Sequence, residues 1–91
     1  MRNDEQKPHI SKVEDRVVFC NLITKEIQKA EKKFPSWPID IIHGVAIMQE
    51  EAGEAIQRAV QVVYEDGPLG QLKKELLHTG AMAMRMWISL L

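Results

Sequence analysis

The stretch DIIHGVAIMQEEAGEAIQRAVQVVYEDG, residues 40–67, decides the fold, because its apolar residues recur at intervals of three and four. This is the spacing of one side of an amphipathic α-helix, and it predicts a helix over residues 40–65. The residues of that apolar side are Ile41, Val45, Met48, Ala52, Ala55, Ile56, Ala59 and Val63. The helix needs another apolar surface to pack against.

Residues flanking this stretch carry helix start and stop signals. Asp40 can cap the N-terminus, and Gly67 suits a left-handed position after the C-terminus. Upstream, Ser11 and Glu14 have the spacing of a capping box, followed by an apolar pattern that predicts a first helix over residues 11–33.

Two prolines separate the first two predicted helices, in FPSWPID at residues 34–40. Pro68 is suited to the first turn of a third helix that continues to the end of the chain. No stretch combines strict alternation with hairpin turns, so we predict an all-α protein. Its single domain is a bundle of three helices over residues 11–91, after a polar tail over residues 1–10.

The composition is that of a small globular domain, with 91 residues, 12 basic and 13 acidic side chains. This near balance of charge argues against a nucleic-acid-binding protein. The polar N-terminus lacks the apolar run of a signal peptide, and no stretch has the length of a membrane span. We therefore expect a cytoplasmic protein without membrane partners, in which the lone Cys20 is a buried apolar residue.

The C-terminal stretch AMAMRMWISLL, residues 81–91, is apolar around most of its circumference. Three helices of one chain would leave part of this surface exposed. The sequence therefore predicts self-association into a homodimer or homotetramer that completes the bundle.

Three acids lie close together on the second predicted helix. At 100° per residue, Glu50, Glu51 and Glu54 fit within an arc of about 100°. Like charges at these spacings repel unless water screens them or a cation neutralises them. A charged side of this kind is also the ordinary design of a surface helix.

The third predicted helix carries a matching pair, because Glu75 and His78 have i, i+3 spacing and point the same way. Helical bundles can join such pairs, here Glu51 with Glu54 and Glu75 with His78, around divalent cations. Mg²⁺ prefers oxygen ligands and commonly acts together with substrate phosphates. A phosphorylated small molecule is the natural ligand of such a site.

The acidic motifs resemble those of the MazG-like all-α nucleoside triphosphate pyrophosphohydrolases, whose signature is EExxE, about twenty residues, and then ExxD. Here the motifs read EEAGE at residues 50–54 and ELLH at residues 75–78, with flanks similar to a short MazG-like subgroup. The likeness covers roughly residues 35–88. The chain departs from the pattern at His78, where the family usually has Asp.

This resemblance implies Mg²⁺-dependent hydrolysis of a nucleoside triphosphate to the monophosphate and pyrophosphate. It implies that Glu51, Glu54, Glu75 and His78 are metal ligands, and that Glu50 is a further ligand or orients the attacking water. An imidazole suits Mn²⁺ or Zn²⁺ better than Mg²⁺, so a changed metal preference, a weaker site and a lost activity all remain open.

Three further residues are candidates for contact with the nucleotide. Arg85 and Lys74 could contact phosphate, and Trp37 could stack on a base. The ordinary alternatives are a solvated lysine and an aromatic residue that fills the core.

Two other functions compete with the enzyme. One is a catalytically reduced relative that binds nucleotide or metal without turnover, which the histidine motivates. The other is a structural helical interaction module, which the apolar C-terminus motivates.

Overall fold

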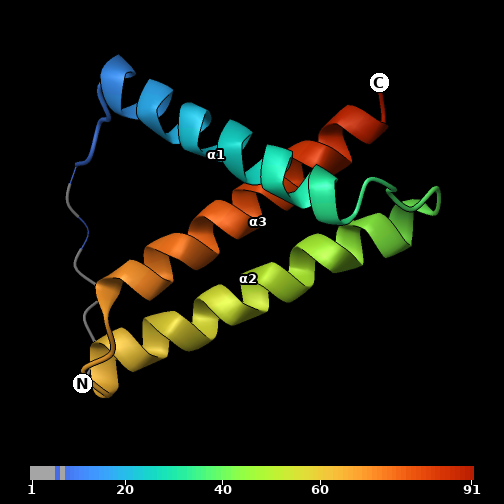
Figure 1. The fold of residues 1–91 in the computed structure, drawn as a ribbon. Coiled ribbons are helices and arrows are strands. Elements are labelled where there is room, and N and C mark those ends of the chain that lie inside the picture. The colour runs from blue at the N-terminus through green and yellow to red at the C-terminus, as the bar shows by residue number, and fades with distance from the viewer. Residues whose placement is uncertain (1–5, 7) are drawn as a thin grey trace.

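A computed structural model describes residue 6 and residues 8–91 of the chain. Its helices are α1 (Val13–Lys33), α2 (Ile41–Tyr64) and α3 (Leu69–Ser89), and the described residues form no strand. α2 and α3 run antiparallel, and α1 crosses α3 (Figure 1). The predicted all-α bundle of three helices is confirmed. Most of the predicted polar tail lies outside the described residues.

A small apolar cluster joins α1 to α3. Ile23 and Ile27 of α1 pack with Ala81, and the half-buried Leu77 and Met82 complete the contact. In the described part of the chain, α1 packs against α3 but not against α2. One side of the bundle, between α1 and α2, is consequently open.

Gly80 allows this close crossing of α1 and α3. A Cβ atom at Gly80 would lie 2.6 Å from Cδ1 of Ile23 and 3.2 Å from Cζ of Phe19. The absence of a side chain therefore lets Ile23 reach the backbone of α3, where it is the most deeply buried large side chain described.

The start of α2 is as predicted, whereas the start of α1 is not. Asp40 caps α2 by accepting hydrogen bonds from the backbone N–H groups of Ile42, at 2.8 Å, and His43, at 3.3 Å. The predicted capping box of α1 is wrong. Lys12 is the N-cap and makes no side-chain cap, while the Ser11 hydroxyl accepts from Arg16 at 2.9 Å.

The turn between α2 and α3 differs from the prediction in its left-handed residue. Asp66 has φ 59°, and no described glycine has a positive φ, so the prediction for Gly67 is wrong. Gly67 serves close approach instead, because a Cβ there would lie 2.9 Å from Cβ of Gln61. Its N–H donates to the Gln61 carbonyl at 2.8 Å, closing the end of α2.

The ends of α3 also differ slightly from the prediction. Pro68 is the N-cap rather than a residue of the first turn, and the helix ends at Ser89 instead of at the end of the chain. The N–H groups of Leu90 and Leu91 donate to Trp87 and Ile88 in a short final turn.

Many apolar side chains are exposed. Cys20 is exposed, so its predicted burial is wrong, and it is not part of the cluster of Ile23 and Ile27 that joins α1 to α3. At the C-terminus, Trp87 is 71% exposed. No described helix combines the length and hydropathy that crossing a bilayer requires.

Candidate metal centre

Antiparallel packing of α2 and α3 brings the two acidic motifs together. One carboxylate oxygen each from Glu51 and Glu75 and one ring nitrogen of His78 lie within 4.8 Å of one another. His78 Nδ1 is 2.9 Å from Oε1 of Glu75 and 3.6 Å from Oε2 of Glu51. Three of the four predicted metal ligands thus form one cluster.

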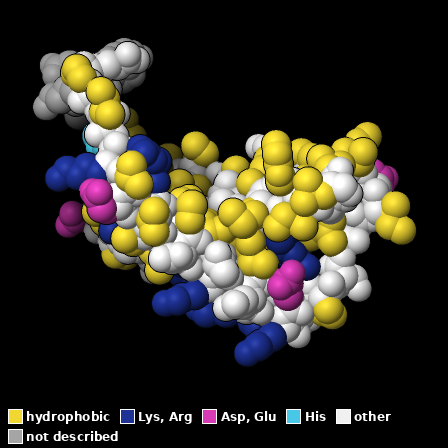
Figure 2. Space-filling model, turned by 90° about the horizontal axis from the view of Figure 1, so that it is seen from above, with side chains coloured by type: hydrophobic (Ala, Val, Ile, Leu, Met, Phe, Trp, Pro, Cys, Tyr) yellow, Lys and Arg dark blue, Asp and Glu magenta, His cyan; other side chains and the backbone are white. Residues whose placement is uncertain are grey.

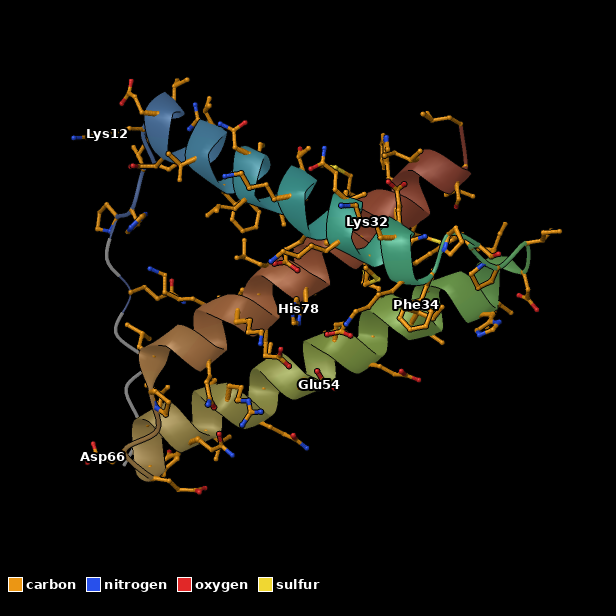
Figure 3. The ribbon with its side chains drawn as sticks, viewed as in Figure 1. Lys12, Lys32, Phe34, Glu54, Asp66 and His78 are labelled. Carbon is orange, nitrogen blue, oxygen red and sulfur yellow. The ribbon has the colours of Figure 1, made fainter. Side chains whose placement is uncertain are left out.

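Glu54, the fourth predicted ligand, adjoins this cluster from an exposed position on α2. Glu54 and His78 are labelled in Figure 3, on α2 and α3 respectively. A hydrogen bond with Glu75 raises the pKa of Glu54 above its usual value, and the charges of Glu51 and Glu75 raise it further. The carboxyl group of Glu54 therefore holds a proton more readily than an isolated glutamate.

Glu75 is the buried member of this carboxyl pair, with 7% of its surface exposed. Its pKa is lowered, first by the hydrogen bond from Glu54, against a raising effect of burial, and then by the charge of His78. Within this pair, the proton therefore favours Glu54, and Glu75 favours the ionised form.

Glu51 has an oxygen, Oε2, that neighbours the His78 imidazole at 3.6 Å but lacks a hydrogen bond. Its Oε2 is buried, and no donor among the described residues makes a hydrogen bond with it. Leaving a buried carboxylate oxygen without a partner costs about 1–3 kcal/mol. A cation between Glu51, Glu75 and His78 would satisfy it, so the donor set fits a divalent metal ion.

An acid from α1 joins the cluster from the other side of the imidazole. Oε2 of Glu26 lies 3.6 Å from Nε2 of His78, while Oε1 of Glu26 lies 3.4 Å from the ammonium group of Lys29. The sequence analysis missed Glu26. The available signal was its spacing of i+3 from Ile23, which puts it beside the residues that dock α1 on α3.

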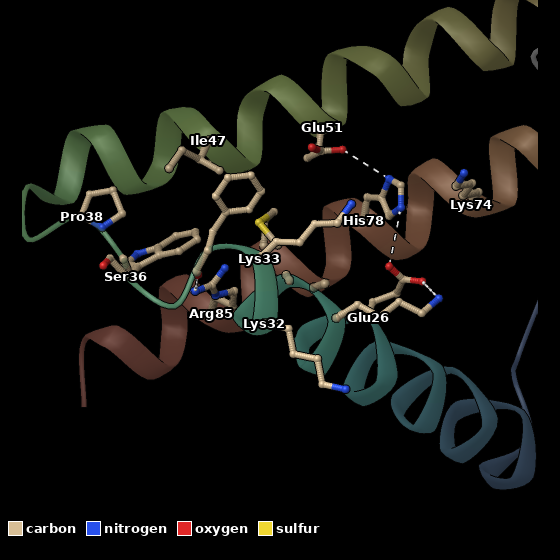
Figure 4. Close-up of a pocket in the computed structure, with 16 residues that line it drawn as sticks. Glu26, Lys32, Lys33, Ser36, Pro38, Ile47, Glu51, Lys74, His78 and Arg85 are labelled. Carbon is tan, nitrogen blue, oxygen red and sulfur yellow. Dashed lines mark hydrogen bonds and ion pairs between the residues drawn. The ribbon is translucent and has the colours of Figure 1, made fainter.

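A cleft of about 1030 Å³ extends from the cluster along the open side of the bundle (Figure 4). All three predicted substrate-binding residues, Trp37, Lys74 and Arg85, line it. Lys29, Lys32 and Lys33 at the end of α1 line it as well. The cleft thus combines an acidic cluster with several cationic side chains, an arrangement suited to a metal-bound polyanion.

Arg85 and Trp37 form the end of the cleft near the linker. The buried Arg85 donates to the Phe34 carbonyl at 2.9 Å, and its guanidinium carbon lies 4.8 Å from the centroid of the Trp37 ring. Arg85 therefore ties the linker to α3. Nε1 of Trp37 is buried and makes no hydrogen bond with any described residue.

Glu50 stands apart from the cluster. It is exposed on α2, and its carboxylate is not among the grouped ligand atoms. Its assignment as the residue that orients water therefore depends on the sequence resemblance.

No family model, curated protein or solved structure matches this chain. Functional interpretation consequently depends on the motifs and on the geometry of the cluster and cleft.

Proposed function

We propose that this protein is a divalent-metal-dependent nucleoside triphosphate pyrophosphohydrolase. In the proposed reaction, water attacks the α-phosphorus, the bond to the bridging oxygen breaks, and the products are a nucleoside monophosphate, pyrophosphate and a proton. This is the reaction implied by the resemblance of EEAGE at 50–54 and ELLH at 75–78 to the MazG-like motifs.

The convergence of Glu51, Glu75 and His78 on one point is the observation that carries the proposal. Glu51 and Glu75, 24 positions apart in the sequence, meet there, and Oε2 of Glu51 is buried without a hydrogen bond to any described residue. Glu51 and Glu75 would repel each other without a compensating positive charge, which a divalent cation or a protonated His78 can supply.

Each residue of the site has a role in this proposal. Glu51, Glu75 and His78 would hold the cation, and Glu54 would join them after losing its proton. A bound divalent cation would neutralise phosphate charge and lower the pKa of a bound water. Lys33 and Lys74 line the cleft on different helices, from which their ammonium groups can contact phosphate oxygens.

The direct test is pyrophosphate release from each common NTP and dNTP, with Mg²⁺ or Mn²⁺. We expect release by the native protein, and a loss of about a hundredfold or more in kcat/KM in Glu51→Gln, since the cation loses a carboxylate ligand. Glu14→Gln, in the exposed first turn of α1, is the matched control and should retain full activity. Equal activity of Glu51→Gln and Glu14→Gln would contradict the assignment.

The position of His78 supports a second candidate, a protein that binds metal and nucleotide without turnover. His78 contacts Glu75 at 2.9 Å, so a protonated imidazole can take the place of a cation in the cluster. This candidate predicts nucleotide binding with no pyrophosphate from the native chain, and activity gained in His78→Asp. If neither the native protein nor His78→Asp released pyrophosphate or bound nucleotide, both candidates would be rejected.

A further inference from the structure

α1 is attached to the rest of the molecule by a short contact. Among the described residues it meets α3 and not α2, and its buried residues are Ile23 and Ile27, about one helical turn apart. Val17 and Val18 are exposed on the same helix, and hydrophobic side chains cover much of the face seen from above in Figure 2, the side on which α1 lies in Figure 1. A helix with few buried contacts opens locally, so one further contact changes how firmly α1 is held.

Glu26 makes a polar contact at the same place. It is half-buried on α1 between Ile23 and Ile27, and its Oε2 lies 3.6 Å from Nε2 of His78. Figure 4 shows the imidazole between this carboxylate and that of Glu51 on α2. Two helices that do not pack against each other in the described part of the chain therefore both contact one side chain of α3.

The two ring nitrogens of His78 have different neighbours. Nδ1 lies 2.9 Å from Oε1 of Glu75 and 3.6 Å from Oε2 of Glu51, so Nδ1 is the nitrogen that belongs to the candidate metal site. An uncharged imidazole carries its hydrogen on one nitrogen and can bind a cation through the other. A cation on Nδ1 therefore leaves the hydrogen on Nε2, where Oε2 of Glu26 is the facing acceptor.

When no cation is bound, the same distances favour the other arrangement of an uncharged ring. Nδ1 is at hydrogen-bond distance, 2.9 Å, from Glu75, whereas Nε2 and Glu26 are 3.6 Å apart, beyond that range. With the hydrogen on Nδ1, Nε2 presents a lone pair to the Glu26 carboxylate, and the contact with α1 is weak. Cation binding thus changes the acid to which the ring donates, from Glu75 to Glu26.

We propose that Glu26 is a positioning residue for the metal site and that it transmits metal binding from His78 to α1. The inference rests on the proposed function, because it requires the cation assigned there. Hydrogen bonds to a carboxylate are about 2.7–2.9 Å long, shorter than the 3.6 Å between Nε2 and Oε2 of Glu26, so this bond holds α1 closer to α3. By linkage, the same contact strengthens metal binding.

This coupling acts on the cationic side of the cleft. Lys29, Lys32 and Lys33 follow Glu26 on α1 and line the cleft with it, and Figure 4 shows Lys33 extending into the cleft. Side chains held in place before a ligand arrives bind it with a smaller loss of conformational freedom. A cation bound at the acidic cluster therefore prepares the facing lysines of α1 for phosphate.

Hydrogen–deuterium exchange of the full chain, with and without saturating Mn²⁺ and without nucleotide, tests the coupling. The measurement is made at about pH 8, where imidazole groups are ordinarily uncharged. We expect Mn²⁺ to slow exchange in residues 20–33 about tenfold or more, since α1 gains a charge-assisted hydrogen bond. Glu26→Met keeps the length of the side chain but lacks the carboxylate, and there Mn²⁺ should change exchange in α1 by less than about twofold.

Glu31→Met is the matched control, because Glu31 is exposed on the same helix and is not among the residues that line the cleft. It should respond to Mn²⁺ as the native protein does. Equal slowing of α1 in the native protein and Glu26→Met would overturn the inference. So would Mn²⁺ binding in calorimetry without slower exchange in native α1. A native protein that binds no Mn²⁺ would instead reject the proposed metal site, and this inference with it.

A second measurement needs no variant of Glu26. Zn²⁺ is diamagnetic and accepts imidazole ligands, so NMR of the zinc-bound protein can identify which ring nitrogen of His78 carries the hydrogen. We expect the hydrogen on Nε2, and the signal that is missing in His78→Asp assigns this ring among the three histidines. Hydrogen on Nδ1, with zinc bound through Nε2, would overturn the proposal even if α1 responds to metal.

Discussion

Replacing Ile23 by alanine should remove much of the stability that holds α1 on the bundle. The Ile23 side chain is 2% exposed and packs against Ala81 in the small cluster at the crossing of α1 and α3. The change removes three carbon atoms, worth about 2.4 kcal/mol in transfer free energy, and leaves a cavity. We therefore expect a loss of about 3 kcal/mol, a large share of the roughly 5–13 kcal/mol typical of a domain of this length.

Urea denaturation followed by circular dichroism, at one fixed protein concentration, would measure this loss. With a slope of about 1–1.5 kcal/mol per molar urea, the midpoint should fall by about 2–3 M. Val18→Ala, at an exposed position of the same helix, should change stability by less than about 0.5 kcal/mol. A loss below about 1 kcal/mol in Ile23→Ala would refute the reasoning that this small cluster holds α1.

Three other perturbations test the cluster and the turn. Because the pKa of Glu54 is raised, the protonated carboxyl group stabilises the metal-free fold fully below pH 4.5, the ordinary pKa of glutamate, and this stabilisation is lost as the pH rises through the raised pKa. The lowered pKa of Glu75 acts in another range, because it reduces stability only when the pH falls below 4.5. Glu54→Gln should therefore flatten the decline of Tm in EDTA as the pH rises above 4.5, and an unchanged slope would contradict stabilisation by a protonated Glu54. Glu26→Gln should weaken Mn²⁺ binding in calorimetry about tenfold, because the imidazole loses its orienting carboxylate, and unchanged affinity would exclude this role. Gly67→Ala should lower the free energy of unfolding by about 1–2 kcal/mol, since the new Cβ would lie 2.9 Å from Cβ of Gln61 in α2. Gly53→Ala is the control and should raise the free energy of unfolding by up to about 1 kcal/mol, because no atom lies within 4 Å of its new Cβ. Equal urea midpoints for the two variants would refute the close approach at Gly67.

The sequence predicted the helices well because their boundaries are set by local signals. Asp40 caps α2 with hydrogen bonds to residues two and three positions away, and the prolines of the linker act on their immediate neighbours. The wrong predictions concern features that contacts between the helices determine. The apolar periodicity of α1 could not distinguish Ile23, which is buried against α3, from Cys20, which is exposed.

The site was predictable to the extent that it follows from helix periodicity. Spacing of i, i+3 placed Glu51 beside Glu54 and Glu75 beside His78, and antiparallel packing of α2 and α3 brought these pairs together. Glu26 was not predictable, because its contact depends on the angle at which α1 crosses α3. That angle depends on side-chain packing at the crossing, which no short sequence pattern encodes.

His78 changes the balance of charge in this acidic cluster. A site built from four carboxylates would repel itself strongly and would depend on cations for neutrality. Here the imidazole of His78 lies 2.9 Å from Glu75 and 3.6 Å from both Glu51 and Glu26, so one bound proton can compensate part of the acidic charge without a metal. A metal ion and a proton cannot occupy the same ring nitrogen together, so a bound metal would displace that proton. His78, which lets the fold tolerate its acids in the absence of metal, is therefore the residue whose replacement by aspartate best separates the two proposed functions, hydrolysis and binding alone.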